Sequence, residues 1–219
     1  MSTTKYHPLL AKYLQQVAQH PLRTKALTTG ILCFLQEILG SKIAGLPAAK
    51  TQKDTPLLLK LLARNHVDIR AVKMGVYGFL VSAPLSHYLM GLLQKAFAGK
   101  TSAGAKVGQL LANNFLIAPI QTAAYLASLA VIGGAKSLDE IVKTVKVGFF
   151  PVIRVTWVVT PTAMLFAQRF VPMELWTIFF SAVSFVIGTV FNARVKRIRL
   201  AAAKKAQKDK DEAEKKKEE

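Results

Sequence analysis

The sequence predicts an all-α fold: a polytopic membrane helix bundle with about four transmembrane helices and one further helix, broken by proline and partly embedded. Three observations lead to this prediction. The chain of 219 residues is 52% hydrophobic, with a mean hydropathy of +0.31. Its formal net charge is +18, yet only 19% of its residues are charged, and they are gathered into separate stretches. Residues 74–94, 107–135 and 175–193 contain no Asp, Glu, Lys or Arg.

The composition excludes several classes of protein. The apolar content is too high for a chain that is disordered along most of its length. The single cysteine, Cys33, excludes a disulfide scaffold. The basic stretches flank apolar segments and lack interleaved aromatic residues, so we do not expect nucleic acid as a partner. Membrane lipids, with anionic head groups at the basic flanks, are the expected partner of the positive charge.

The charge-free windows give three predicted spans, over residues 71–94, 107–132 and 173–193. A helix rises ~1.5 Å per residue, so roughly 20 residues cross a hydrocarbon core of roughly 30 Å. A helix also satisfies its own backbone hydrogen bonds in lipid. The alternative is three buried helices of a soluble core, which we disfavour because a small protein seldom holds several helices that are apolar on all sides.

The other span and the proline-broken helix carry charges of their own. The stretch 24–46 is interrupted by Gln36, Glu37 and Lys42, and it can cross the membrane if Glu37 faces other helices. The segment 145–171 is apolar but contains two arginines and two prolines. Because proline removes a backbone donor and bends a helix, we interpret this segment as broken and covered by its neighbours. Its interrupting residues are Pro151, Arg154, Pro161 and Arg169.

The two ends differ from the bundle, which covers residues 24–193. Residues 1–23 hold an amphipathic pattern that suits a helix lying in the headgroup layer. Residues 194–219 begin with a basic run and continue as a Lys/Glu-rich tail, which predicts a solvated helix or a disordered tail. With four spans both termini lie on one side of the membrane, and the positive-inside rule favours the cytosol.

Polar side chains inside the spans form the candidate pore lining, in which amides and hydroxyls would replace the hydration of a small solute. The alternative is ordinary helix packing, in which small residues let backbones approach and polar side chains bond across helices. We favour a functional role for Glu37, because an intramembrane carboxylate is a functional candidate by default. The full set is Gln36, Glu37, Ser82, Ser86, His87, Asn113, Asn114 and Gln121.

The sequence gives no candidate for a catalytic, cofactor-binding or metal-binding site. Its four histidines and single cysteine lack the spacing of metal ligands. Neither a G-x-S-x-G nor a G-x-G-x-x-G motif occurs. We therefore expect no cofactor, no metal and no enzymatic activity.

Several spaced motifs lie between about residue 8 and residue 196. One stretch is similar to the patterns D-x-R-x-x-[RK]-x-G and G-P-x-x-H-x-[WF]-Y, although Ala83 replaces a glycine. A later stretch is similar to W-x-x-W-P followed by V-P. The residues that match these motifs are Asp68, Arg70, Gly75, Pro84, His87, Tyr88, Pro119, Trp157, Pro161 and Pro172. Through them the chain resembles the Mpv17/PMP22 family of small integral membrane proteins, although Asn113 stands where the family has Asp.

The resemblance implies a pore or pore-like protein that passes small metabolites without a cofactor and forms homo-oligomers. Tyr13, Val17, Pro21 and Lys25 are similar to the family's N-terminal peroxisomal targeting pattern. They favour the peroxisomal membrane over the mitochondrial inner membrane, which is the alternative. The alternative function is a structural or organising membrane protein that recruits partners through its basic tail.

Overall fold

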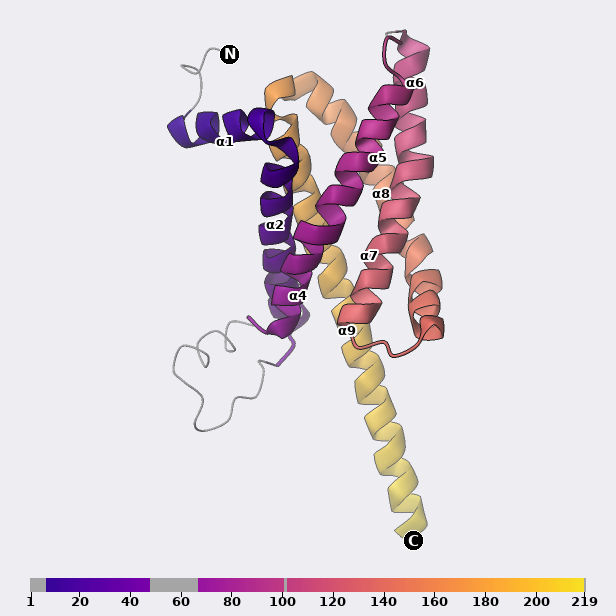
Figure 1. Cartoon of the computed structure of the whole chain (residues 1–219). Helices are drawn as coiled ribbons and strands as arrows, with labels where there is room; N and C mark the ends of the chain where they lie inside the picture. The colour runs from indigo at the N-terminus through magenta and orange to yellow at the C-terminus, as the bar shows by residue number, and fades with distance from the viewer. Residues whose placement is uncertain (1–6, 48–66, 101, 219) are drawn as a thin grey trace.

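The computed structural model describes residues 7–47, 67–100 and 102–218, and within these ranges it contains helices and no strand (Figure 1). The α-helices are interrupted twice by a short π-helix and once by a 3₁₀ turn. In chain order the elements are α1 (Pro8–Gln19), α2 (Pro21–Ala44), α4 (Ile69–Tyr77), the π-helix η2 (Gly78–Ser82), α5 (Ala83–Ala96), α6 (Ala103–Ala112), the π-helix η3 (Asn113–Ile117), α7 (Ala118–Ile132), α8 (Leu138–Phe170), the 3₁₀ helix η4 (Met173–Leu175) and α9 (Trp176–Glu218).

Five helical stretches, rather than about four, are long and apolar enough to cross a membrane. The additional one is α8, which remains a single α-helix of 33 residues through Pro151 and Pro161. The break predicted within residues 145–171 is therefore absent, because lipid supplies no competing hydrogen-bond partner and a proline-containing helix remains the best structure. The five stretches are Pro21–Ala44, Ile69–Ala96, Gly104–Ile132, Leu138–Phe170 and Met173–Ile198.

An odd number of crossings separates the two ends of the chain. The helix α1 lies at the upper end of the bundle in Figure 1, whereas α9 runs out of the lower end. The prediction that both termini share one side of the membrane depended on four spans and does not hold for five. The lower end also carries the C-terminal end of α2, the start of α4 and the connection from α7 to α8, and we call it the tail side of the bundle (Figure 1).

The helices α2 and α4 cross with their backbones in direct contact. A Cβ atom built on Gly78 would lie 2.7 Å from the Thr29 carbonyl oxygen and 2.9 Å from Cys33 Sγ. One built on Gly30 would lie 3.1 Å from the Gly75 carbonyl oxygen. Small residues at the crossing therefore permit the close approach that stabilises helix pairs in lipid.

Both π-helices precede an Ala-Pro pair, and the pair explains them. The Ala83 N–H donates to the Gly78 carbonyl and the Ala118 N–H to the Asn113 carbonyl, five residues back in each case. The next carbonyl along then faces a proline, which has no N–H to donate. At Asn114 this carbonyl accepts a hydrogen bond of 2.8 Å from Trp157 Nε1 on α8. This hydrogen bond thus links η3 to α8.

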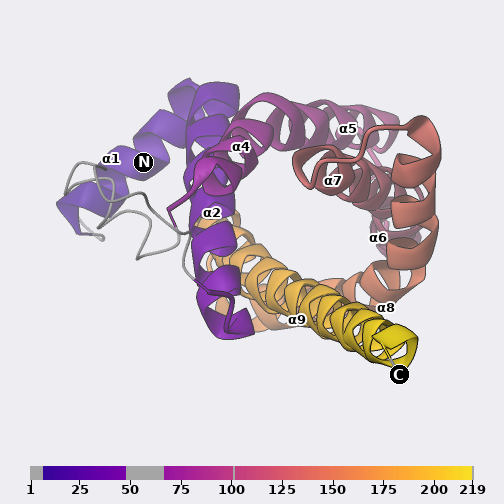
Figure 2. The same cartoon turned by 90° about the horizontal axis from the view of Figure 1, so that it is seen from below.

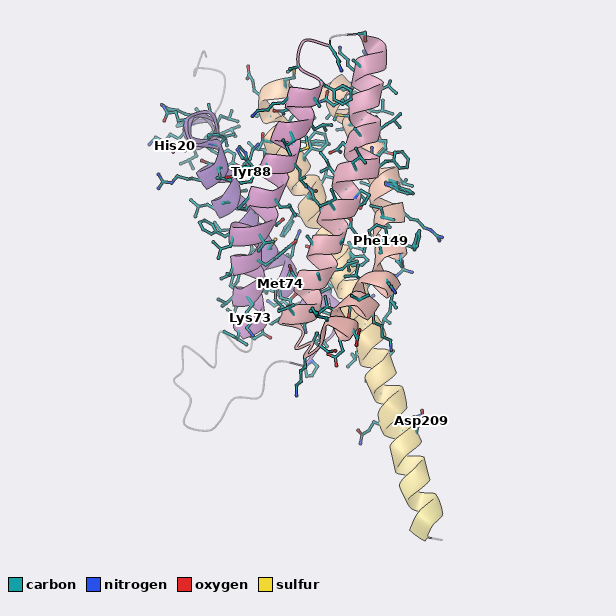
Figure 3. All side chains as sticks on the ribbon, turned by 45° about the vertical axis from the view of Figure 1, so that its right-hand side comes forward. His20, Lys73, Met74, Tyr88, Phe149 and Asp209 are labelled. Carbon is teal, nitrogen blue, oxygen red and sulfur yellow. The ribbon has the colours of Figure 1, made fainter. Side chains whose placement is uncertain are left out.

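Seen from below, α2, α4 with α5, α6 with α7, α8 and α9 follow one another around the bundle (Figure 2). Aromatic rings meet inside it: the ring centroid of Tyr125 lies 6.2 Å from that of Tyr77 and 6.4 Å from that of Phe191. Met74, labelled in Figure 3, and Leu129 are buried beside them. Apolar and aromatic side chains therefore fill this part of the interior.

We predict that Gly78→Ala destabilises the protein by about 1–3 kcal/mol, because the added methyl overlaps the backbone of α2. The matched control is Gly91→Ala on α5, whose methyl meets no atom within 4 Å and should leave stability unchanged or raise it slightly. Thermal unfolding of the detergent-solubilised protein can be followed with a thiol-reactive dye, since the single cysteine, Cys33, is buried. Equal melting temperatures for the two variants would contradict the close crossing.

Candidate functional site, a buried ion cluster between three helices

The carboxylate of Glu37 joins three helices on the tail side of the bundle. Glu37 lies on α2 and is 1% exposed. Its Oε1 is 3.1 Å from Arg70 Nε in the first turn of α4 and 2.6 Å from Lys196 Nζ on α9. Its Oε2 accepts a hydrogen bond of 2.7 Å from Asn192 Nδ2, also on α9. We call these four residues the Glu37 cluster.

The ammonium group of Lys196 is fully bonded although it is only 4% exposed. Besides Glu37 Oε1, it donates to the Glu37 carbonyl oxygen at 3.0 Å and to Ser41 Oγ at 2.6 Å. An ammonium has three donors, and all three are used. Burying a charge without such partners would be costly, so this geometry makes the position of Lys196 tolerable in the interior.

Spacing along each helix brings the partners together. Residues four apart on a helix share a face, as Glu37 and Ser41 do on α2 and Asn192 and Lys196 do on α9. Gly40 lies between the two helices, and a Cβ atom there would be 3.0 Å from the Asn192 amide. The absence of a side chain at Gly40 therefore lets α9 approach α2 closely enough for the ion pair.

The D-x-R motif has a direct structural role. Asp68 caps α4 by accepting a hydrogen bond of 2.9 Å from the Ala71 N–H, which fixes where the helix begins. Arg70 then lies in the first turn, where the helix dipole disfavours a cation and the Glu37 carboxylate offsets that cost. Gly75, five residues on, packs against α2. Asp68 thus caps α4, Arg70 forms its ion pair with α2, and Gly75 allows it to pack against α2.

The cluster holds two cations and one carboxylate. Arg70 is its open member, with 30% of its side chain exposed. Asn192 Oδ1 and Arg70 Nε are buried without an aligned hydrogen bond among the described residues. The arrangement is suited to fixing helices and leaves a net positive charge on the tail side. Glu37 is buried within it, and its carboxylate faces α4 and α9.

Two other predicted lining residues also bond between helices or within one. Gln36 Nε2 donates to the carbonyl oxygens of Ser184 and Phe185 on α9, at 3.1 and 3.3 Å. Gly188 gives it room, since a Cβ there would lie 2.5 Å from Gln36 Nε2. The buried Asn114 donates from Nδ2 to the Leu110 carbonyl of its own helix, at 3.1 Å.

The remaining predicted lining residues lie elsewhere in the bundle. They are partly exposed and none belongs to the Glu37 cluster: Ser82, Ser86, His87, Asn113 and Gln121. Two shallow hollows of about 380 and 390 Å³ lie between α8 and α9 and are lined almost entirely by apolar side chains such as Val159 and Phe179. The predicted polar residues do not line them.

The targeting-like residues lie at the corner between α1 and α2. Tyr13 on α1 shares a hydrogen bond of 3.1 Å with Thr28 Oγ1 on α2, and Pro21 is the first residue of α2. Val17 lies on α1 and Lys25 on α2. Of the other family-motif residues, Tyr88 is exposed, Pro161 lies within α8, and Pro172 immediately precedes η4.

Sequence reasoning missed Asn192 and Lys196 as members of the cluster, and Ser41 as a hydrogen-bond partner of Lys196. The predicted last span ended at residue 193, so Lys196 was assigned to the solvated tail. The signal that could have found it is the buried acid itself, since Glu37 requires a cation on a neighbouring helix. Within the described residues, no group of three or more His, Cys, Asp or Glu could hold a metal ion.

We predict that Glu37→Gln lowers the free energy of unfolding by about 3–5 kcal/mol, because it leaves Lys196 buried without its counter-charge. The matched control is Asp139→Asn, an exposed acid on α8, for which we expect a change of less than about 0.5 kcal/mol. Dye labelling of Cys33 during denaturation measures both. A Glu37→Gln protein as stable as the control would show that the ion pairs do not hold the helices together.

Comparison with known proteins gives the chain its relatives. The model of the Mpv17 / PMP22 family matches residues 130–192. The Woronin body membrane protein wscA of Aspergillus fumigatus is 46% identical over 198 residues, which cover 90% of this chain and 81% of that protein. The Woronin sorting complex protein of Neurospora crassa is 43% identical over 90% of this chain, which spans 60% of that longer relative.

A more distant relative is the peroxisomal membrane protein PMP22 of Arabidopsis thaliana, 25% identical over 89% of this chain and 94% of its own length. No solved structure matches the chain. The sequence motifs, the helical bundle and these relatives agree, and we conclude that this multi-pass membrane protein belongs to the Mpv17/PMP22 family.

Proposed function

We propose that this chain is an organising protein of the peroxisomal membrane that takes part in the sorting of Woronin bodies. The observation that carries the proposal is that intramembrane polar groups bond the helices to one another. Gln36 bonds α2 to α9, and the buried Glu37 bonds α2 to both α4 and α9. A bundle whose helices are held together in this way suits a protein that binds partners better than a protein that forms a solute pore.

The relatives support the same reading. The two named for the Woronin body are 46% and 43% identical to this chain, whereas the relative named PMP22 is 25% identical. The similarity to the Woronin proteins extends over 90% of this chain. The peroxisomal location is supported by the name of the plant relative and by the targeting-like residues at the α1–α2 corner.

The tail supplies a surface for partners. The helix α9 runs without interruption from Trp176 to Glu218, and the Glu37 cluster anchors its middle to α2. Beyond Ile198, where the membrane-spanning part ends, about 20 residues of helix project roughly 30 Å from the tail side. Asp209 lies on this projection, well clear of the other helices (Figure 3). Anchoring therefore places the exposed Lys204, Lys208 and Asp209 beyond the end of the candidate span.

Passive passage of small solutes is the second candidate function. The observation that favours it is the circular arrangement of the helices, together with the half-buried polar residues Ser86 on α5 and Gln121 on α7 (Figure 2). A path through the bundle would have to bypass the Glu37 cluster and the aromatic contacts around Tyr125. For this reason we place it second.

Truncation after residue 199 tests the proposed function, because it removes the charged projection and keeps Lys196. In Neurospora crassa cells that lack the Woronin sorting complex protein, the full chain should restore Woronin-body sorting, scored by microscopy. The truncated chain should reach the membrane without restoring it. The control Gly91→Ala should behave as the full chain. Failure of the correctly inserted full chain, or equal rescue by both, would contradict the proposal.

Reconstitution in liposomes separates the two candidate functions. We expect the flux of small polar solutes to equal that of empty vesicles for both the full chain and the truncated chain. Flux above that level that survives truncation would instead support the pore.

A further inference from the structure

The helix α8 carries a charge near the middle of a membrane span. Arg154 lies midway along Leu138–Phe170, is exposed, and has the apolar Ile153 and Val155 beside it. The ion pairs of the described residues join Glu37 to Arg70 and Lys196, and no described side chain pairs with Arg154. A charge at such a position is costly and marks a functional site by default. Its counter-charge must come from outside the described bundle.

Arg154 does not point at the bundle interior. The buried face of α8 is formed by Ile153, Ala163 and Ala167. Trp157, also on α8, donates a hydrogen bond to the Asn114 carbonyl oxygen inside the bundle. Arg154 lies to one side of that face, on the same stripe as Phe150, which is 61% exposed. The stripe therefore faces the surrounding lipid.

Two lysines continue the stripe towards the tail side. Lys143, Lys146, Phe150 and Arg154 are spaced by three, four and four residues, so they lie along one face of α8, and all are exposed. Helical side chains lean towards the helix N-terminus, so the side chains of both Arg154 and Lys146 lean towards the tail side. About 12 Å of helix separates these two residues. The long arginine stem covers part of that distance, as expected for a side chain that reaches towards the head groups.

The acidic residues near this stripe do not neutralise it. The Glu140 carboxylate accepts a hydrogen bond of 2.8 Å from the Lys136 backbone N–H. Asp139 is exposed one turn before Lys143 and offsets at most that lysine. The positive charges of Lys146 and Arg154 therefore remain. Lys146 lies at the level of the head groups, and Arg154 extends towards that level from the hydrocarbon.

We propose that this stripe of α8 binds the phosphate group of an anionic phospholipid in the tail-side leaflet, with Arg154 drawing the head group towards the hydrocarbon. Charge complementarity favours a lipid over a partner helix. An acidic transmembrane helix would match Arg154 alone, whereas a phosphate at the leaflet surface meets Lys146 and Arg154 together. The inference is independent of whether the protein sorts organelles or passes solutes.

Native mass spectrometry of the purified full chain tests the proposal, with phosphatidylinositol and phosphatidylcholine of identical acyl chains as probes. Arg154→Gln should weaken phosphatidylinositol binding about fivefold, the effect of one basic residue beside an anionic leaflet, and leave phosphatidylcholine binding unchanged. Arg154→Lys should retain most of the preference. The matched control is Arg169→Gln, at the other end of α8, which should bind phosphatidylinositol like the unmodified chain.

Three results would overturn the proposal. One is equal phosphatidylinositol binding by Arg154→Gln and the unmodified chain. Another is dissociation of an oligomer by Arg154→Gln with no change in lipid preference, which would assign Arg154 to an acidic group on a second copy. The third is full competition by soluble inositol phosphate, which would point to a free anion. Dye labelling of Cys33 checks that each variant is folded, and Arg154→Leu, which suits a lipid-facing position, repeats the test.

Discussion

The ion pair between Glu37 and Lys196 is the constraint on which the arrangement of the helices depends. In a medium of low dielectric neither charge is tolerable alone, and together they fix where α9 meets α2. Arg70 extends the same constraint to α4, the N-terminal part of the second span. The three helices enclose this cluster on the tail side, and the close contacts at Gly40 and Gly78 follow from the need to bring the polar groups within reach.

This constraint links structure to function. Because the middle of α9 is fixed to the bundle, the charged part of the helix beyond Ile198 projects as an extension of a transmembrane element. Of the polar groups that suggested a solute path, Gln36 and Glu37 bond to α9 and α4, which supports the proposal of an organising protein over that of a pore. Arg154 differs from Glu37 and Lys196, since it is exposed on α8 and we propose a lipid phosphate as its partner.

The sequence predicted the helical class and the family, because charge-free windows and spaced motifs are local patterns. It gave burial of Glu37 against other helices as the condition for the first span, since a lone carboxylate in lipid is costly. It did not reveal Lys196 as the partner, because pairing across more than 150 residues leaves no local periodicity. It also overestimated Pro151 and Pro161 as breaks, since their effect depends on whether the surroundings can replace the lost backbone bonds, and in lipid the helix persists.

A double-mutant cycle between Glu37 and Lys196 tests the central claim most directly. The measured quantity is the change in unfolding free energy for Glu37→Gln, for Lys196→Met and for the two combined. If the pair fixes the helices, the combined variant loses much less stability than the two single losses added together, with a coupling of at least about 2 kcal/mol. Additive losses, with no coupling, would contradict the claim that this buried pair holds α2 and α9 together.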